Sequence, residues 1–245
     1  MQITDLKKIL FLDIETVPQV SSLDKLNPEL AHLWENKFDT IKNRMPEKYS
    51  EGTTAAEAFA NSAGIYSEFG KIICISVGFI YFRGMEMHFK TKSFAGHDEK
   101  SLLIDFVTML NKFCVTTEYT ICGHNVKEFD IPYICRRMLI NGLGLPPIFQ
   151  ISGKKPWEIN FIDTLELWRF GDYKNYTPLK LLTAVFGIPT PKDDIDGSQV
   201  AEVYYKENNL ERISRYCQKD VVATAQVFLQ INNIQTFKTE NIEYI

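Results

Sequence analysis

The chain has 245 residues, 45% of them hydrophobic, and a formal net charge of −4. This length and composition are typical of a globular protein with a sizeable core, and we expect a single domain over residues 1–245. The negative net charge excludes nucleic-acid binding through bulk electrostatics, although metal ions at clustered carboxylates can supply positive charge locally. The sequence shows neither an apolar run of membrane-spanning length nor a secretory signal pattern at its start, so we predict a cytoplasmic protein.

The cysteines form no CxxC pair, and most of them lie inside apolar or helical patterns. We therefore predict reduced thiols rather than zinc ligands or disulfide partners. They are Cys74, Cys114, Cys122, Cys135 and Cys217.

The first predicted element is a buried strand that opens with the apolar residues 9–12 and ends by Pro18. Because alternate residues of a strand point to the same face, Asp13 and Glu15 would project together, with Ile14 turned into the core. Two facing carboxylates are unfavourable unless a cation lies between them. This pair is therefore a candidate metal site.

Residues 19–70 read as a helical insertion. Asn27 followed by Pro28 is typical of a helix start, and Thr54 with Glu57 fits a capping box for a second helix. The simpler interpretation is a helical cover over one edge of the domain, and a lid or substrate gate is the alternative.

The pattern then changes to strands. Residues 72–81 and 85–90 are rich in β-forming residues and can pair as an antiparallel hairpin through a turn at Arg83–Gly84. An amphipathic helix over 102–113 and a strand over 119–124 follow. This order predicts a mixed sheet with helices packed on it.

A second polar cluster follows that strand. Asp130 lies at the start of a predicted helix, where a carboxylate can be a simple cap or part of a site. His124 and Asn125 stand just beyond the strand and could bind a backbone or phosphate oxygen, although His124 could equally be a hydrogen-bonded structural residue.

Residues 160–163 suggest a further short strand, with Thr164 capping the helix after it. Aromatic residues are interleaved with bases in this region and could stack the bases of a nucleic-acid strand, although we expect at least half of them in the core. They are Trp157, Trp168, Phe170, Tyr173 and Tyr176. The acidic loop 191–197 lacks the spacing of a calcium loop and is interpreted as a solvated loop, and Ser198 as the cap of a short helix.

The last predicted helix runs over about 210–231 and carries Tyr216 and Asp220 one turn apart on one face. Asp220 interrupts a largely apolar face, which is costly unless it has a partner. Four acids from three elements, Asp13, Glu15, Asp130 and Asp220, could thus meet at one place. Oxygen-rich sites of this kind suit Mg²⁺ or Mn²⁺, and two such ions roughly 4 Å apart can clamp an in-line displacement at phosphorus.

The stretches FLDIETVP, GHNVKEFDIPYICRR and YCQKDVVAT together resemble the three motifs of the DEDD superfamily of 3′-5′ exonucleases. The wording is most similar to the proofreading domain of family-B DNA polymerases and to the stand-alone bacterial exonucleases related to it. The resemblance spans about residues 9–231 and implies an α/β, ribonuclease H-like fold with a mixed five-stranded sheet flanked by helices.

By position, the resemblance implies that Asp13, Glu15 and Asp220 bind the nucleophile-side metal ion. Asp13 would be shared with a second ion that Asp130 holds. Tyr216, four residues before Asp220, matches the tyrosine subclass (DEDDy), since the histidine subclass has its base where this chain has Arg215. A phenol of pKa about 10 is a poor base at neutral pH, so we expect Tyr216 to orient the water.

We also expect substrate contacts from five residues of the first two motifs, Thr16, Val17, His124, Asn125 and Phe129. The predicted activity is metal-dependent 3′-5′ hydrolysis of single-stranded nucleic acid, with DNA preferred, releasing nucleoside monophosphates. The alternatives are a non-catalytic nucleic-acid-binding module on the same fold and a two-metal small-nucleotide phosphohydrolase.

Overall fold

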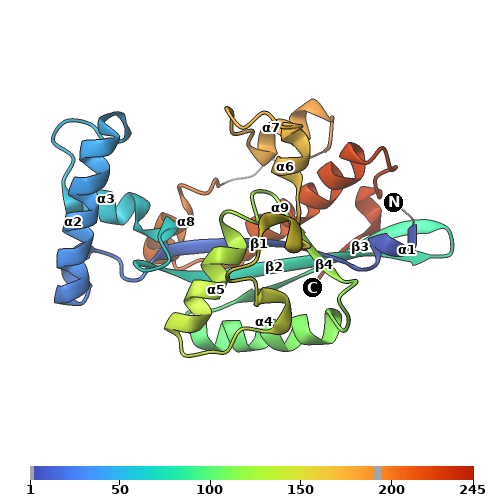
Figure 1. Cartoon of the computed structure of the whole chain (residues 1–245), viewed down its shortest axis with the longest axis horizontal. Helices are drawn as coiled ribbons and strands as arrows, with labels where there is room; N and C mark the ends of the chain where they lie inside the picture. The colour runs from blue at the N-terminus through green and yellow to red at the C-terminus, as the bar shows by residue number, and fades with distance from the viewer. Residues whose placement is uncertain (1–2, 190–194) are drawn as a thin grey trace.

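A computed structural model describes residues 3–189 and 195–245 of the chain. In these ranges one mixed sheet has the strand order β5-β4-β1-β2-β3-β6 (Figure 1). The strands are β1 (Ile9–Pro18), β2 (Gly70–Arg83), β3 (Glu86–Ala95), β4 (Thr120–Gly123), β5 (Ile162–Asp163) and β6 (Ile242–Tyr244). Strand β1 lies inside the sheet, antiparallel to β2 and parallel to β4.

The predicted hairpin is confirmed, because β2 and β3 pair antiparallel through Gly84, which has a φ of 62°. The expected count of five strands is wrong by one. The sixth strand, β6, has three residues and pairs parallel with β3. Such a short edge strand carries too few residues for an alternating pattern to be recognised.

Helices flank both faces of the sheet. In Figure 1, α4 and α5 lie on one side, and α6, α7, α8 and α9 lie on the other. The helices are α1 (Ile3–Leu6), α2 (Pro28–Arg44), α3 (Ala55–Ser62), α4 (Glu99–Phe113), α5 (Asp130–Ile140), α6 (Thr164–Arg169), α7 (Leu179–Val185), α8 (Val200–Glu202) and α9 (Leu210–Ile231). Among the described residues, none of these helices combines the length and the apolar character that crossing a membrane would need.

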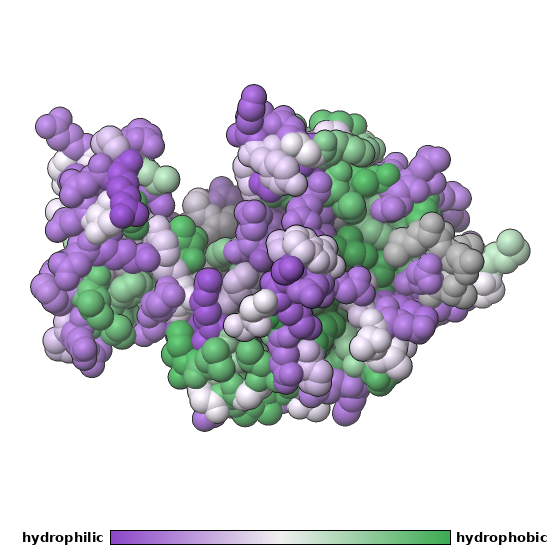
Figure 2. Space-filling model, viewed as in Figure 1, coloured by the Kyte–Doolittle hydropathy of each residue, from purple (hydrophilic) through white to green (hydrophobic). Residues whose placement is uncertain are grey.

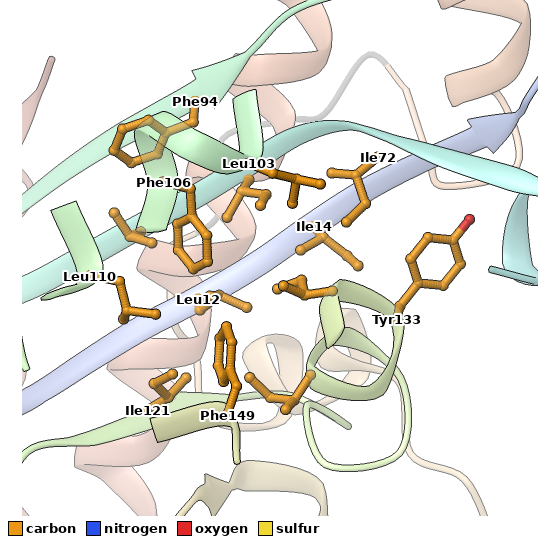
Figure 3. Close-up of a cluster of buried hydrophobic side chains, with 14 of the residues drawn as sticks. Leu12, Ile14, Ile72, Phe94, Leu103, Phe106, Leu110, Ile121, Tyr133 and Phe149 are labelled. Carbon is orange, nitrogen blue, oxygen red and sulfur yellow. The ribbon is translucent and has the colours of Figure 1, made fainter. Parts of the chain in front are cut away.

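The side chains of β1 divide between two cores. Leu12 and Ile14 face the α4 and α5 side, where Phe106 and Tyr133 belong to the same buried cluster (Figure 3). Phe11 faces the α9 side and makes an edge-to-face contact with Phe228, with ring centroids 5.7 Å apart. Asp13 and Glu15 follow the direction of Phe11, so the alternation of the strand sends both carboxylates toward α9.

The insertion is helical, as predicted. Asn27 caps α2 by accepting from the backbone N–H of Glu29, and Thr54 and Glu57 form the expected capping box of α3. Trp34 is fully buried in a separate apolar cluster and makes an edge-to-face contact with Phe59. The two helices stand at one end of the molecule, and their outer surface is mostly hydrophilic (Figures 1 and 2).

A buried ion pair joins the insertion to the sheet. Arg137 of α5 donates from Nε to Oε1 of Glu99 over 2.9 Å, and the same carboxylate oxygen accepts from the backbone N–H of Ile72. The guanidinium also donates to the carbonyl oxygen of Ser67, at the end of the insertion. One pair therefore links α4, α5, β2 and the chain that leads into β2.

Two predicted caps are wrong. Asp163 rather than Thr164 caps α6, by accepting from the backbone N–H of Leu165. Ser198 is not a helix cap, since its N–H and hydroxyl both donate to Asp196. Part of the acidic loop over 191–197 lies outside the described residues, which resume at 195. All five cysteines lie in the described ranges and are free, as predicted.

Candidate active site

The first pair of acids is held by the middle of β1. Asp13 lies opposite Ser76 of β2 and Glu15 lies opposite Cys74, and a β-bulge follows directly after Glu15. Asp13 is partly exposed and Glu15 is buried. The strand continues to Pro18, so the two carboxylates arise from within a strand whose backbone is paired with β2 at both positions, just beyond the residues 9–11 that pair with β4.

Asp130 approaches the Asp13–Glu15 pair from the start of α5. It is the first residue of α5, is 4% exposed, and accepts a hydrogen bond at Oδ1 from the backbone N–H of Ile14 over 3.2 Å. Phe129 occupies the cap position of α5. Asp130 therefore does more than cap its own helix, since it bonds to the residue between the two acids of β1.

Helix α9 supplies the third group of polar residues. Tyr216 and Asp220 lie one turn apart, and their side chains are hydrogen-bonded to each other. The thiol of Cys217, on the same helix, donates to Oδ2 of Asp13 over 3.3 Å. The ligand atoms of Asp13, Glu15 and Cys217 lie within 4.8 Å of one another, a grouping able to hold a metal ion.

The carboxylates strongly perturb one another. Burial, followed by the negative charges of Asp130 and Asp220, raises the pKa of Asp13 well above its ordinary value. Burial and the charge of Asp13 do the same to the pKa of Glu15, and burial raises the pKa of Asp130 to about 7. Buried like charges favour either protonation or a bound cation.

Burial and the same carboxylates also raise the pKa of Tyr216. Burial is the largest cause that raises its pKa, followed by the charges of Asp220, Glu15 and Asp13. Its hydroxyl is therefore neutral at physiological pH and can donate a hydrogen bond.

A cavity of about 810 Å³ opens over this cluster and is lined by Asp13, Asp130, Tyr216 and Asp220, and by Asn125 among others. A smaller cavity of about 230 Å³ lies on the other side of Phe129 and contains Glu15 and Thr16. Phe129 and Ile14 line both cavities. Asn61 and Ile65 from the end of the insertion also line the smaller one, so the insertion forms part of the wall beside Glu15.

Two expected substrate contacts have other environments. The side chain of Val17 is fully buried in an apolar cluster with Val200 and Ile213, so it faces neither cavity. The ring of His124 lines the larger cavity, but both its nitrogens are engaged, with the Thr164 hydroxyl and the Thr177 carbonyl oxygen at 2.9 Å each. The structural interpretation of His124 fits this arrangement.

Asp163 is a buried acid that sequence reasoning had not assigned to the site. Its two carboxylate oxygens accept from the backbone N–H groups of Asn125 and Lys127, and one of them also caps α6. The loop between β4 and α5 is thereby fixed, with Asn125 in the left-handed region at a φ of 63°. The signal available was an acid at the end of a short strand, directly before a helix.

The comparisons with known proteins agree with this geometry. The profile of a family described as predicted 3′-5′ exonuclease related to the exonuclease domain of PolB matches residues 65–244. The match includes Asp130, Tyr216 and Asp220 and begins after Asp13 and Glu15, which the fold brings to the same place. A comparison with curated proteins gives no match.

Among solved structures, the chain is similar to the family B DNA polymerase from the hyperthermophilic archaeon Pyrobaculum calidifontis, with a TM-score of 0.51 and 14% identity. The similarity covers 91% of this chain and 24% of the polymerase chain, so the chain spans about a quarter of that protein. At this identity the likeness concerns the fold, which is ribonuclease H-like.

Proposed function

The chain belongs to the family of predicted 3′-5′ exonucleases related to the exonuclease domain of PolB, and from this premise we propose a metal-dependent reaction on single-stranded 3′ ends. The proposed substrate is DNA, and the proposed products are nucleoside monophosphates. The observation that carries the proposal is the convergence of four carboxylates from β1, α5 and α9, three of which line the larger cavity.

The donor set fits a divalent cation. Carboxylate oxygens are the ligands that Mg²⁺ and Mn²⁺ prefer, and burial together with the neighbouring acids raises the pKa values of Asp13, Glu15 and Asp130, a cost that a bound cation offsets. We propose that Asp13, Glu15 and Asp220 hold one ion and that Asp13 and Asp130 hold a second. The chemistry that two such ions supply is activation of a water molecule and stabilisation of the leaving oxygen.

The protein's own residues orient the attacking water and fix the position of the carboxylates. Tyr216 is neutral and hydrogen-bonded to Asp220, so its hydroxyl is suited to orient the attacking water rather than to remove its proton. This arrangement supports the proposed assignment to the tyrosine subclass (DEDDy). Asp163 fixes the loop that leads to Asp130, and so holds the second-motif acid at the distance from β1 that the Ile14 bond requires.

We propose that the terminal nucleotide lies beside Thr16 and Phe129, at the smaller cavity. Phe129 lines both cavities, so it can contact a base or sugar in the smaller one while the phosphate meets the acids in the larger one. Asn125, at the rim of the larger cavity, is a donor for the phosphate oxygens. His124 supports this region by joining α6 to the chain before α7.

The test uses 5′-labelled and 3′-labelled single strands of DNA and RNA with Mg²⁺ or Mn²⁺. We expect stepwise shortening of the 5′-labelled strand and immediate release of the 3′ label, both abolished in Asp13→Asn. Glu118→Gln is the matched control, because it removes an exposed carboxylate that pairs with Lys8 away from the site. Absence of metal-dependent cleavage by the wild type would overturn the proposal. Cleavage confined to mononucleotides would instead indicate a small-nucleotide phosphohydrolase.

The proposed location is the cytoplasm. Free thiols at all five cysteines support it, because cysteines remain reduced in that compartment.

A further inference from the structure

The segment between α6 and α7 presents aromatic rings to solvent. Phe170 is 87% exposed, Tyr173 is 75% exposed and Tyr176 is 59% exposed. The prediction that at least half of Trp157, Trp168, Phe170, Tyr173 and Tyr176 lie in the core is wrong, since Trp157 is exposed as well. Of those five, Trp168 is the one that packs inward, against Phe186 with ring centroids 5.6 Å apart. Single exposed apolar side chains are ordinary, whereas exposed rings grouped within one short segment are typical of an interaction surface.

The backbone at Phe170 adds a second observation. Phe170 ends α6 in the left-handed conformation, with a φ of 44°. That position usually holds glycine or asparagine, because a bulky side chain with positive φ is strained. Neither local backbone preference nor burial accounts for a phenylalanine here. The ring at this position is therefore available for a contact outside the chain.

The segment is continuous with the active site. Tyr176, Pro178 and Lys180 line the larger cavity together with Asp13, Asp130 and Asp220. The ring of Tyr176 lies 6.2 Å from that of His124, which is itself bonded to the carbonyl oxygen of Thr177. In Figure 1, α6 and α7 stand on the same side of the sheet as α9. A ligand extending from the carboxylates can therefore reach the exposed rings.

The charge of the segment favours an anion. Residues 169–180 contain three basic residues, Arg169, Lys174 and Lys180, and one acid, Asp172. Arg169 is mostly buried and pairs with Glu128, so Lys174 and Lys180 supply the exposed positive charge. Arg169 lies over the ring of Tyr173, with 5.7 Å between its guanidinium carbon and the ring centroid. Aromatic rings combined with basic side chains are typical of surfaces that bind single-stranded nucleic acid. Each nucleobase can stack on a ring while its phosphate contacts a lysine or arginine side chain.

We infer that residues 169–180 bind the single strand upstream of the terminal nucleotide, with bases stacked on Phe170 and Tyr173 and with Tyr176 at the entrance to the cavity. This inference rests on the proposed exonuclease function. It assigns to the α6–α7 segment the selection of unpaired strands, because base faces are free to stack only when they are not paired within a duplex.

Binding is measured first, without catalysis, from the fluorescence anisotropy of 5′-labelled (dT)₁₂ in EDTA. We expect Phe170→Ala and Tyr173→Ala each to weaken binding roughly tenfold, as for the loss of one base–aromatic stack. Tyr173→Phe should bind as the wild type does. Trp157→Ala is the matched control, since this ring is also exposed and lies beside a lysine, but it precedes β5 and lies outside the segment 169–180 that continues into the larger cavity. Equal affinity of the double variant Phe170→Ala/Tyr173→Ala and the wild type would overturn the inference.

Cleavage is measured second, with Mn²⁺ and two substrates. For (dT)₁₂, the double variant should raise KM roughly tenfold or more and leave kcat near the wild-type value. The p-nitrophenyl ester of thymidine 5′-monophosphate has no upstream nucleotides, so its hydrolysis should be unchanged. An unchanged KM for (dT)₁₂ would overturn the inference and leave the proposed function intact. Absence of wild-type cleavage would overturn the proposed function, while the anisotropy result still decides whether the segment binds a single strand.

Discussion

Asp130 accepts the backbone N–H of Ile14 at 3.2 Å, and this bond connects residues that are 116 positions apart in the chain. Ile14 lies between Asp13 and Glu15, so the second-motif acid is attached to the strand that carries the first two. The relative position of the three carboxylates is therefore set by the backbone of β1 and not by flexible side chains alone. The predictions below follow from this cluster and from the core that supports it.

Asp130→Asn should stabilise the metal-free protein at high pH. Because the carboxyl pKa is raised from 3.8 to about 7 by burial, the folded state holds a proton that the unfolded state releases between these values. The free energy of unfolding of the wild type therefore falls as pH rises through this window. The asparagine retains an oxygen for Ile14 and carries no charge.

Thermal unfolding in EDTA should give similar stabilities for the two proteins near pH 4. At pH 8 the variant should be more stable by up to about 4 kcal/mol, at 1.36 kcal/mol for each pKa unit. The same variant should lose at least about 10²-fold in kcat. A variant less stable than the wild type at pH 8 would show that Asp130 is stabilised as an anion in the metal-free fold.

Metal binding should release protons. Asp13 and Glu15 have pKa values raised well above normal, and a carboxylate must lose its proton to bind a cation. Titration with Mn²⁺ at pH 7, in two buffers that differ in ionisation enthalpy, should therefore give different heats. The melting temperature should rise more on metal addition at pH 8 than at pH 6. Identical heats in both buffers would contradict protonated carboxyls in the metal-free site.

Tyr216→Phe should slow cleavage by about 10- to 100-fold through loss of a positioning hydroxyl. The shape of the pH–rate profile should stay the same, because burial and the nearby acids keep the pKa of Tyr216 above its usual value and the phenol does not titrate near neutrality. Metal binding measured by calorimetry should be retained. Tyr81→Phe is the control, since that hydroxyl bonds to Glu243 at a distant part of the sheet. A profile that loses its basic limb only in Tyr216→Phe would assign the phenol a role in proton transfer.

Glu99→Ala should destabilise the fold by about 3–5 kcal/mol, because it leaves the buried guanidinium of Arg137 without its partner. The comparison is Glu118→Ala, which breaks the exposed pair with Lys8 and should cost less than about 1 kcal/mol. Both free energies come from urea unfolding. At 25 °C the folded Glu99→Ala protein should retain its kcat, since Glu99 lines neither cavity of the site. Equal losses in the free energy of unfolding for the two substitutions would contradict a larger contribution of the buried pair to stability.

Strong periodic patterns allowed most of the fold to be predicted. The alternation in β1 and the 3.6-residue period of α9 were long enough to fix which faces carry Asp13 and Asp220. Local signals did not identify the cap of α6. Both Thr164 and Asp163 have side chains that can cap a helix, and in the structure Asp163 accepts the backbone N–H of Leu165. For Phe170 the sequence left two interpretations open, a base-stacking surface and the core, because an aromatic residue is usually buried while the neighbouring basic residues favour a surface. Burial of Val17 depends on α8, which approaches from 180 positions along the chain.

The arrangement of β1 and α9 has a consequence for how the enzyme is made. Asp13 precedes Asp220 in the chain, so a ribosome-bound fragment holds the first acids before the last one exists. The strand that carries Asp13 also lacks its α9 cover until then. Hydrolytic competence therefore requires synthesis to proceed through α9, and a product truncated before α9 would carry the early motifs without a functioning centre.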